Sequence, residues 1–508
     1  MSRSLHSLLK SVGVLIPTGL KDTHIENISC DSRIVKAGDL FIGLPGETVD
    51  GGIFWQKALT EGAYAAVISK DAAILKPVAI DDPVVVFPEP FVKLVGELAA
   101  EFWGHPSSKM SLIGVTGTNG KTTTTYLIEY LCNAVGKKTA LLGTLVNRWP
   151  SHNEVAIHTT SFASSLQYQL SEAASEGAEF VAMEVSSHAL AQSRVAGCKF
   201  SGAIFTNLTQ DHLDYHSSME MYFDAKASLF EASMFRDGLV KSVVNVDDEW
   251  GKLLAQKLQK HCWKSTLGLE NGESQGAELF FSDLKKTSNG VKGIVHTPIG
   301  QGYFVSPLIG DFNLMNFLQA VGVLIQLGLP LEDLLIQISK FKGVPGRMQR
   351  IELSNEKKTA TLPNVFVDYA HTPDGLKNAL TALRPFTKGE LICVFGCGGD
   401  RDRGKRSKMG AIAGELADKL VVTSDNPRSE DPEKIIEDIK LGISSNVKLF
   451  IEVERAKAIE SAIYNATKGD VILIAGKGHE DYQIFGKDKI HFDDREKAAN
   501  ALRNTIQL

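Results

Sequence analysis

The stretch Ser111-Leu-Ile-Gly-Val-Thr-Gly-Thr-Asn-Gly-Lys-Thr122 is an apolar run that enters a glycine-rich turn and ends in a Lys-Thr pair. Apolar residues then recur at helical spacing as far as Gly136, so the sequence predicts a buried strand over 110–116 followed by a turn and a helix. Gly117 and Gly120 permit backbone conformations in which successive N–H groups point inward at phosphate oxygens. The sequence therefore predicts a phosphate-binding loop at the end of a strand in a mainly parallel sheet.

Lys121 and Thr122 give this loop its chemistry. A lysine at this place reaches the outer phosphates of a nucleoside triphosphate, and the hydroxyl of the next residue holds the accompanying Mg²⁺. The loop departs from the G-x-x-x-x-G-K-[ST] spacing, because Val115 stands where that pattern has glycine. A tight glycine turn without a ligand is the alternative interpretation. The strand, the helix and the Lys-Thr pair together favour phosphate binding.

Length and composition narrow the class of protein. With 508 residues and about 150 residues per domain, the chain predicts about three domains. The 54 basic and 60 acidic residues show no long basic run, which argues against a nucleic-acid partner. Six cysteines without a C-x-x-C pair fit a reducing cytoplasm. The apolar stretch 12–16 is short and ends at Pro17, so we expect neither a signal segment nor a membrane span.

Three segments differ in their patterns. Residues 1–106 contain short strands at 39–43 and 65–69 and a helix at 91–103, which predicts a small α/β domain. Residues 107–345 and 346–508 alternate strands with helices, which predicts two further α/β domains with mainly parallel sheets and a hinge at 341–347. Segment 277–305 alternates short extended runs with glycines, and predicts an antiparallel insertion at the sheet edge. The expected strands of the last two domains are 110–116, 138–144, 179–185, 201–206, 242–246, 364–368, 391–396, 419–424, 447–452 and 470–475.

Polar residues follow the strands of the central domain. Glu184 ends one strand, at the place where a second protein ligand for nucleotide-bound Mg²⁺ is normally supplied. After the next strand, residues 211–216 hold two carboxylates and two imidazoles, including His212. A lone histidine is more often a satisfied core residue, but this density favours a metal site. By sequence alone Lys226 is a solvated lysine.

The last domain carries four polar turns at strand ends: Asp368-Tyr-Ala-His371, the glycine-arginine turn 396–406, Asp425-Asn-Pro-Arg428 and Gly476-Lys-Gly-His-Glu480. Two of them place arginine in glycine- or proline-shaped turns, where a fixed guanidinium suits a carboxylate. A solvated surface turn explains any one of these segments. Four at one end of a sheet favour a binding site.

Taken together, these residues resemble the Mur ligase family, the ATP-dependent amide-forming enzymes of peptidoglycan precursor synthesis. The resemblance covers essentially the whole chain, and the shortened phosphate loop of that family accounts for Val115. The matching segments are Gly117–Thr122, Glu184–His188, Asn207–Asp214, Gly310–Asn316, Pro345–Met348 and Asp368–Pro373. Within the family, Asp31-Ser-Arg33, the turn 396–406 and Asp425–Arg428 are most similar to the member that adds meso-2,6-diaminopimelate.

The resemblance implies three domains: 1–106 for the UDP substrate, 107–345 as the P-loop ATPase, and 346–508 as a Rossmann-like domain for the amino acid. ATP is implied at Gly117, Thr118, Asn119, Gly120, Lys121, Thr122, Thr123, Asn313 and Asp368. The UDP substrate is implied at Ser32, Glu47, Thr48, Val49, Thr159, Thr160, Ser186, Gln192 and Arg194. The amino acid is implied at Arg401, Asp425, Asn426, Pro427, Arg428, Gly476 and Glu480.

The resemblance also implies the catalytic and metal groups. Lys121, His212, Lys226 and Arg347 match catalytic positions, and Lys226 matches a lysine that the family carbamylates. Thr122 and Glu184 would hold one Mg²⁺, and His212 with carbamylated Lys226 a second.

The implied reaction joins meso-diaminopimelate to the D-glutamate γ-carboxylate of UDP-N-acetylmuramoyl-L-alanyl-D-glutamate through an acyl phosphate. The implied enzyme is a cytoplasmic monomer. Three alternatives remain: a folylpolyglutamate synthetase, which would lack the uridine-binding domain; a P-loop NTPase acting as a regulatory or motor module; and a nucleotide-binding protein without catalysis.

Overall fold

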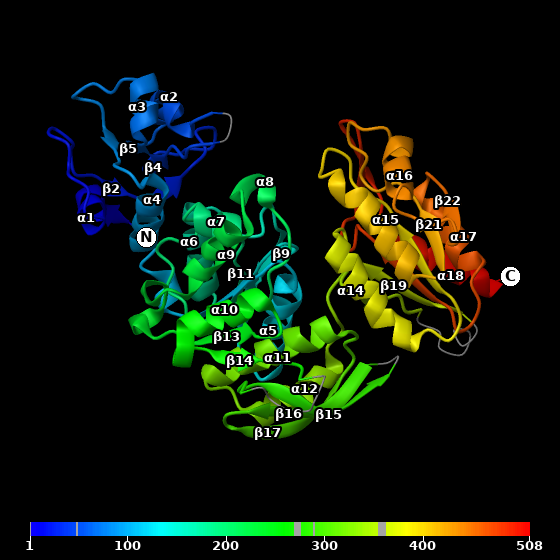
Figure 1. Cartoon of the computed structure of the whole chain (residues 1–508). Helices are drawn as coiled ribbons and strands as arrows, with labels where there is room; N and C mark the ends of the chain where they lie inside the picture. The colour runs from blue at the N-terminus through cyan, green and yellow to red at the C-terminus, as the bar shows by residue number, and fades with distance from the viewer. Residues whose placement is uncertain (1, 47–48, 269–275, 288–289, 354–361, 508) are drawn as a thin grey trace. The chain divides into compact units, whose positions relative to one another are not determined.

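The computed structural model describes residues 2–46, 49–268, 276–287, 290–353 and 362–507 (Figure 1). Its backbone divides into two compact units, Met1–Lys264 with Gln319–Pro330, and Ser265–Leu318 with Leu331–Leu508. The first unit contains the phosphate-binding loop. The second contains the four polar turns predicted from the end of the sequence.

The first unit begins with a parallel sheet of order β3-β4-β5-β6. Its elements are β1 (Arg3–Ser4), α1 (Leu5–Ser11), β2 (His24–Ile25), β3 (Asn27–Ser29), β4 (Asp39–Ile42), α2 (Trp55–Thr60), β5 (Ala65–Ile68), α3 (Lys70–Leu75), β6 (Val84–Val86) and α4 (Phe91–Phe102). Because strand side chains alternate, Leu40 and Ile42 pack with α1 and α4, whereas Phe41 packs with Trp55 on the other face. The predicted strands at 39–43 and 65–69 and the helix at 91–103 are confirmed.

A larger sheet follows, with the strand order β10-β9-β8-β11-β7-β12-β13-β14 among the described residues. Strands β8, β11, β7, β12 and β13 are parallel, and β9 and β10 form an antiparallel hairpin at the edge. The bounds are β7 (Ser111–Thr116), β8 (Thr139–Leu142), β9 (Val146–Trp149), β10 (His152–Val155), β11 (Phe180–Glu184), β12 (Gly202–Phe205), β13 (Ser242–Asn245) and β14 (Trp263–Ser265). The predicted parallel strands are confirmed, and the edge hairpin was not predicted.

Helices cover this sheet because each strand turns back through a helix that buries its apolar stripe. They are α5 (Lys121–Ala134), α6 (Ala163–Ser175), α7 (Ser187–Ala191), α8 (Leu213–His216), α9 (Met219–Ala227), α10 (Glu249–Leu258) and α11 (Asp311–Gln326). Leu112 of β7 belongs to a core cluster with Leu166 and Leu170 of α6. On Gly202 an added Cβ would lie 2.7 Å from Val323, so glycine lets α11 lie close against β12.

Segment 277–305 forms β15 (Phe280–Thr287), β16 (Gly290–Thr297) and β17 (Gly300–Ser306), an antiparallel sheet in the second unit. The antiparallel pairing is confirmed, and an isolated parallel bridge joins Leu279 to Ser265 at the end of the edge strand β14, as expected for an insertion at the sheet edge. The three strands nevertheless form a sheet of their own. Its apolar face gives the physical reason. Phe281 and Phe304 contact Phe317 of α11, so the small sheet is held by packing and needs no shared ladder.

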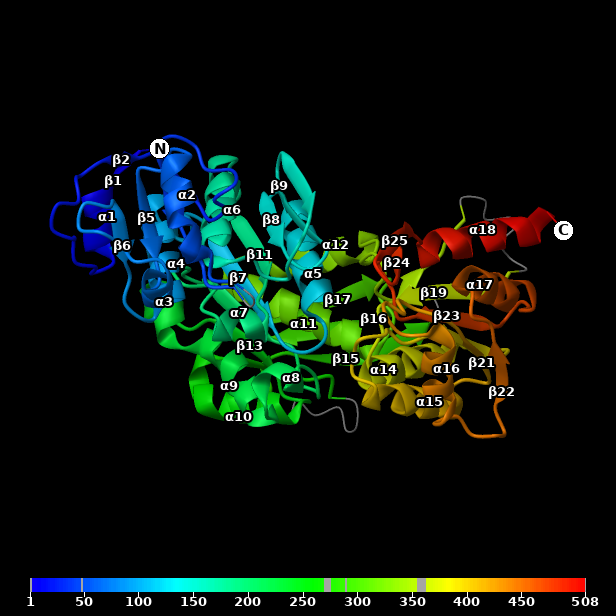
Figure 2. The same cartoon turned by 90° about the horizontal axis from the view of Figure 1, so that it is seen from above.

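The C-terminal sheet has the order β18-β19-β23-β20-β21-β22 and is parallel except for β18. Its elements are α12 (Leu331–Gln337), β18 (Gln349–Arg350), β19 (Asn364–Asp368), α14 (Pro373–Leu383), β20 (Leu391–Phe395), α15 (Gly404–Leu416), β21 (Lys419–Val422), α16 (Pro432–Lys440), β22 (Lys448–Ile451), α17 (Arg455–Tyr464), β23 (Val471–Ala475), β24 (Tyr482–Phe485), β25 (Asp488–His491) and α18 (Asp494–Gln507). Two core clusters lie on its two faces, one with α14, α15 and α16 and the other with α17 and α18 (Figure 2). The α/β class and the doubly wound C-terminal sheet are therefore confirmed.

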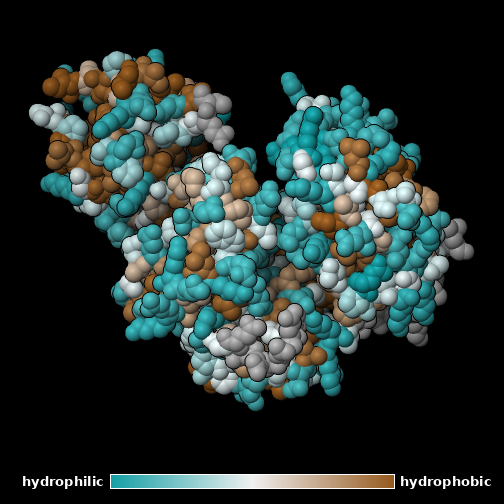
Figure 3. Space-filling view, viewed as in Figure 1, coloured by the Kyte–Doolittle hydropathy of each residue, from teal (hydrophilic) through white to brown (hydrophobic). Residues whose placement is uncertain are grey.

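On the face shown in Figure 3, apolar residues gather over the N-terminal sheet region and the rest is mainly polar. Exposed apolar side chains there include Leu15, Ile34, Ile74, Leu75 and Ile80. In the part of the chain that the structure describes, no helix is both long enough and apolar enough to cross a bilayer. The domain bounds 1–106, 107–345 and 346–508 stay a prediction.

Candidate active site

The phosphate-binding loop joins β7 to α5 and is fixed by the segment that follows β12. The N–H of Thr118 donates to the carbonyl of Asn207 at 2.9 Å, and the N–H of Asn119 donates to its Oδ1 at 3.0 Å. Gly117 has φ 145°, and an added Cβ there would lie 1.9 Å from Thr206 Oγ1. Only glycine fits this close approach, so Gly117 fixes the path of the loop beside Thr206.

Thr122 and Glu184, predicted to share one Mg²⁺, are in contact. Thr122 Oγ1 donates to Glu184 Oε2 at 3.1 Å, and both side chains are buried. Thr144, after β8, donates its N–H to Oε1 and its hydroxyl to Oε2, each at 2.9 Å. Sequence reasoning missed Thr144, although it too follows an apolar strand, which was the signal used for Glu184.

The two lysines of the site meet at the same loop carbonyl. Lys121 Nζ donates to the carbonyls of Gly117 and Thr118, each at 2.8 Å, and Lys226 Nζ donates to Gly117 at 2.9 Å. Lys226 is 1% exposed, so it is not the solvated lysine that its sequence suggests. Burial, aided by the charge of Lys121, lowers the pKa of the Lys226 amine well below its usual value.

His212 lies in a group of aromatic rings around α8 and α9. Its ring is 4.9 Å from that of His188 and 6.0 Å from that of Tyr222, and Tyr222 also stacks on His216 at 5.1 Å. Burial lowers the pKa of His212, and the charges of Lys121 and Lys226 act in the same direction. In the structure, the charges of Lys121 and Lys226 therefore both act on His212. The ring contacts of His188 and Tyr222 were not found from the sequence.

The residues predicted to hold the sugar and peptide form one hydrogen-bonded group. Thr160 Oγ1 donates to the Glu184 carbonyl at 2.8 Å and accepts from the N–H of Ser186 at 3.1 Å. Arg194 donates to the Thr160 carbonyl at 3.0 Å and to Gln192 Oε1 at 2.7 Å. The hydroxyl of Thr159 lies 3.1 Å from that of Thr144. This group is therefore continuous with the Glu184 cluster.

The predicted UDP contacts near the N-terminus are less well defined. Ser32 is buried and Val49 is about half exposed. Glu47 and Thr48 lie outside the described residues.

Arg347 and Asp368 lie together in the second unit. The guanidinium of Arg347 stacks on Tyr369 at 4.4 Å, and Asp368 Oδ2 accepts the N–H of Met348 at 2.6 Å. Burial raises the pKa of Asp368 to about 6, and the charge of Arg347 opposes this. Asn313, also predicted at the ATP, is buried and donates to the Ile309 carbonyl at 2.8 Å.

The predicted amino-acid ligands Asn426 and Glu480 contact each other. Asn426 Nδ2 donates to Glu480 Oε2 at 2.9 Å, and Lys477 Nζ donates to the same oxygen at 3.0 Å. On Gly476 an added Cβ would lie 2.7 Å from Asp425 Oδ2, so glycine lets the two turns approach. The ends of β21 and β23 therefore supply one cluster, as predicted. Lys477 was not singled out from the sequence.

The arginines of the C-terminal turns divide into two kinds. Arg428, next to Pro427, has φ 52°, and its guanidinium donates to the Gly399 carbonyl at 2.7 Å. Arg401 is exposed and donates to the Asp400 carbonyl at 3.4 Å. Arg406 is instead buried in ion pairs with Glu430 and Asp438, at 2.8 and 2.9 Å. Arg406 therefore stabilises the fold, whereas Arg428 and Arg401 donate to backbone carbonyls of the turn 396–406.

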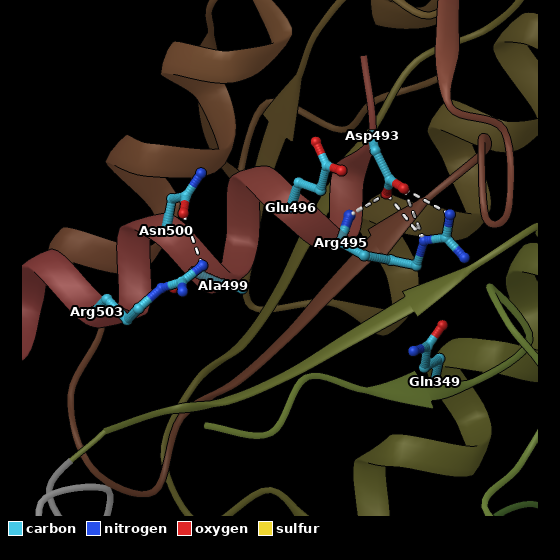
Figure 4. A pocket seen from close by; sticks show the side chains of 7 residues that line it. All are labelled: Gln349, Asp493, Arg495, Glu496, Ala499, Asn500 and Arg503. Carbon is cyan, nitrogen blue, oxygen red and sulfur yellow. Dashed lines mark hydrogen bonds and ion pairs between the residues drawn. The ribbon is translucent and has the colours of Figure 1, made fainter. Parts of the chain in front are cut away.

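A separate pocket of about 580 Å³ lies on the second unit (Figure 4). It is lined by Gln349, Asp493, Arg495, Glu496, Ala499, Asn500 and Arg503. Its arginines are already paired, Arg495 with Asp493 at 2.5 Å and Arg503 with Asn500 at 2.8 Å. It contains none of the residues predicted from the sequence.

No group of three or more His, Cys, Asp and Glu side chains suited to a metal ion occurs among the described residues. Mg²⁺ does not need such a group, because it is commonly bound by one or two carboxylates together with substrate phosphates. The buried Glu184 carboxylate beside the Thr122 hydroxyl at the phosphate loop fits that donor set.

The chain belongs to the Mur ligase family of ATP-dependent amide ligases. Residues 115–324 match the profile described as "Mur ligase middle domain", residues 346–478 match "Mur ligase, glutamate ligase domain", and residues 24–103 match "Mur ligase family, catalytic domain".

Curated relatives share most of the sequence. Over 503 residues the chain is 59% identical to a UDP-N-acetylmuramoyl-L-alanyl-D-glutamate--2,6-diaminopimelate ligase of Parasynechococcus marenigrum (strain WH8102), covering 99% of both chains. A protein of the same name from Prochlorococcus marinus (strain MIT 9313) is 59% identical over 506 residues, covering 100% of both.

Solved structures are similar as well. A UDP-N-acetylmuramoyl-L-alanyl-D-glutamate--2,6-diaminopimelate ligase matches with a TM-score of 0.70 and 33% identity over 99% of both chains. A folylpolyglutamate synthase of Mycobacterium tuberculosis matches with a TM-score of 0.57 and 16% identity, over 81% of this chain and 94% of that chain. The second likeness concerns the fold alone.

Proposed function

We propose that this chain uses ATP to join meso-2,6-diaminopimelate to the D-glutamate γ-carboxylate of UDP-N-acetylmuramoyl-L-alanyl-D-glutamate, in peptidoglycan precursor synthesis. The observation that carries the proposal is the full-length identity of 59% to ligases of that name. The hydrogen-bonded phosphate loop and the Asn426–Glu480 cluster support it. A carboxylate has a poor leaving group, so its phosphorylation must come before attack by an amine.

Several residues of this chain would assist the transfer of the phosphoryl group from ATP. Lys121 and the loop N–H groups would neutralise charge that gathers on the transferred phosphoryl group, and Arg347 would add a guanidinium charge. Thr122 and Glu184 would hold Mg²⁺, which supplies further charge neutralisation when bound. Asn313 and Asp368 would contact the adenosine.

Lys226 is proposed to be carbamylated. The amine attacks CO₂ only as its neutral form, forming an N–C bond and releasing one proton. Burial of Lys226 and its lowered pKa favour that neutral form. The resulting carbamate would be an anionic group beside His212, suited to a second Mg²⁺.

The UDP substrate is assigned to Ser32, Glu47, Thr48, Val49, Thr159, Thr160, Ser186, Gln192 and Arg194. The amino acid is assigned to Arg401, Asp425, Asn426, Pro427, Arg428, Gly476 and Glu480. Arg428 suits the distal carboxylate of diaminopimelate, because a guanidinium binds a carboxylate through two parallel hydrogen bonds. Glu480 suits the distal ammonium. We also propose that the enzyme is a cytoplasmic monomer.

The test is phosphate release with ATP and UDP-N-acetylmuramoyl-L-alanyl-D-glutamate, with and without each amino acid. We expect release to require meso-diaminopimelate and to be weak with L-lysine. Steady turnover of ATP without any acceptor would contradict the proposal and would favour a regulatory or motor NTPase. Release with a folate and glutamate, but not with the UDP substrate, would favour a folylpolyglutamate synthetase.

A further inference from the structure

Lys477 is a fully buried lysine whose polar contacts are both with predicted amino-acid ligands. Its Nζ donates to Glu480 Oε2 at 3.0 Å and to Asn426 Oδ1 at 3.2 Å. The side chain is 0% exposed, and its ammonium lies 5.3 Å from the ring centre of Tyr482. Burying a cation costs free energy unless the cation is paired. The ion pair with Glu480 therefore accounts for the burial of Lys477.

The turn that carries Lys477 has a glycine on each side of the lysine. Gly476 has φ 116° and Gly478 has φ 55°, so the residues on both sides of Lys477 lie in the left-handed region. On Gly478 an added Cβ would lie 2.6 Å from the Gly346 carbonyl. The backbone is thus fixed on both sides, which fixes the direction of the lysine side chain.

The contacts of Lys477 leave one oxygen of Glu480 available. Oε2 accepts from both Lys477 and Asn426, whereas Oε1 has no hydrogen-bond partner among the described residues. Asn426 cannot turn over freely, because its Oδ1 also accepts the N–H of Ile484 at 3.1 Å. The carboxylate is therefore held by one oxygen and presents the other.

We propose that Lys477 is a positioning residue for amino-acid selection, and that it orients Glu480 so that Oε1 binds the distal ammonium of the substrate. This inference rests on the proposed function. Arg428 makes a different side-chain contact, since its guanidinium donates to the Gly399 carbonyl whereas Lys477 donates to Asn426 and Glu480. The site would then bind the two distal groups of diaminopimelate through two different side chains, Glu480 and Arg428.

The proposal is tested with Lys477→Met and three amino acids: meso-diaminopimelate, L-lysine and 2-aminopimelate. L-lysine lacks the distal carboxylate, and 2-aminopimelate lacks the distal ammonium. In Lys477→Met we expect the kcat/KM preference for meso-diaminopimelate over 2-aminopimelate to fall about 10- to 100-fold, the range typical of a hydrogen bond to a charged group. The preference over L-lysine should stay, because both substrates carry the ammonium.

The controls separate positioning from damage to the fold. The KM values for ATP and the UDP substrate should not change, and the exposed Lys434→Met on α16 should match the wild type throughout. Damage to the fold would lower kcat/KM for all three amino acids equally and leave both preferences intact. If Lys477→Met does not fold, Lys477→Gln, which keeps a hydrogen-bond donor, is measured in the same way.

An unchanged preference over 2-aminopimelate in a folded variant would overturn the role of Lys477. Failure of the wild type to use meso-diaminopimelate would instead overturn the proposed function. The two failures are therefore distinguishable in one set of assays.

Discussion

Lys121 is the residue on which the phosphate chemistry most directly depends. Its ammonium lies over the loop, held by two loop carbonyls at 2.8 Å. We expect Lys121→Ala to lower kcat by about 100- to 1000-fold, because a charge that stabilises the transferred phosphoryl group is lost. Phosphate release measures this, and a thermal melt checks the fold. Near wild-type turnover would remove Lys121 from the mechanism.

Lys226 is the second residue for which we make a prediction, because its proposed carbamylation can be measured. Lys226→Ala should lower turnover about 100-fold or more, because both the buried amine and the proposed carbamate are removed. Millimolar formate or acetate should partly restore activity by supplying an anion beside His212. Intact-protein mass measurement of the active wild type under CO₂ should show one added CO₂. An unmodified amine in the fully active enzyme would contradict carbamylation.

Arg428 should decide between meso-diaminopimelate and L-lysine. With L-lysine the guanidinium would lack its carboxylate, a penalty of about 2–5 kcal/mol, which corresponds to tens to thousands of fold in kcat/KM. Arg428→Ala should lose most of this discrimination by losing the reaction with meso-diaminopimelate. Lys434→Met serves as the exposed control. Equal kcat/KM values for the two amino acids in the wild type would contradict the assignment.

At the scale of the element, a buried ion pair between helices α17 and α18 also contacts two strand ends of the C-terminal sheet. Arg455, at the start of α17, donates to Asp494 of α18 at 2.7 and 2.8 Å, and both side chains are 0% exposed. The same guanidinium donates to the carbonyls of Ser424 and Ala475, which precede the Asp425 and Gly476 turns. One arginine thus fixes the starting points of both turns that we propose bind the amino acid.

Breaking this pair should destabilise the C-terminal sheet. We expect Arg455→Met to lower the free energy of unfolding by about 3–5 kcal/mol, because Asp494 becomes a buried, unpaired charge. The double variant Arg455→Met/Asp494→Leu should recover much of the loss. Denaturant unfolding measures both, with Lys448→Met in the exposed pair with Glu390 as a control expected to show no change. A single variant as stable as the wild type would show that the pair contributes little.

Prediction from sequence worked best where periodicity decides structure. The strands and the phosphate loop were found because buried parallel strands are continuous apolar runs that end in polar turns. The edge hairpin β9–β10 was missed because its residues, such as Arg148 and Glu154, are polar and lack such a run. Segment 277–305 joins the edge strand β14 as predicted, but its three strands form a separate sheet, since pattern does not specify which strands pair.

Single polar residues were harder to predict for a related reason. Thr144 donates a hydrogen bond to Glu184 and Lys477 donates one to Asn426, which are distant in the chain, and spacing does not show such contacts. The sequence places Lys226 on a helix and gives no sign of its burial. Only the fold brings it to the carbonyl of Gly117.

At the scale of the whole molecule, the residues proposed to bind ATP and the amino acid belong to different compact units. The phosphate loop and Glu184 lie in the first unit, whereas Arg428 and Glu480 lie in the second. The amine must come within bonding distance of the acyl phosphate, and water must be excluded so that the intermediate is not hydrolysed. The proposed reaction therefore requires the phosphate loop and the 425–428 and 476–480 turns to meet around the substrates.

We expect small-angle scattering to show a smaller radius of gyration with an unreactive ATP analogue, the UDP substrate and meso-diaminopimelate than without ligands. We expect the change at the predicted hinge 341–347, which precedes the C-terminal sheet and contains Gly343 and Gly346 with φ 81° and 66°. In Lys121→Ala, which lacks the phosphate contact, the same mixture should give a smaller decrease or none. A radius that stays the same in the wild type at saturating ligand would contradict closure by a large hinge motion.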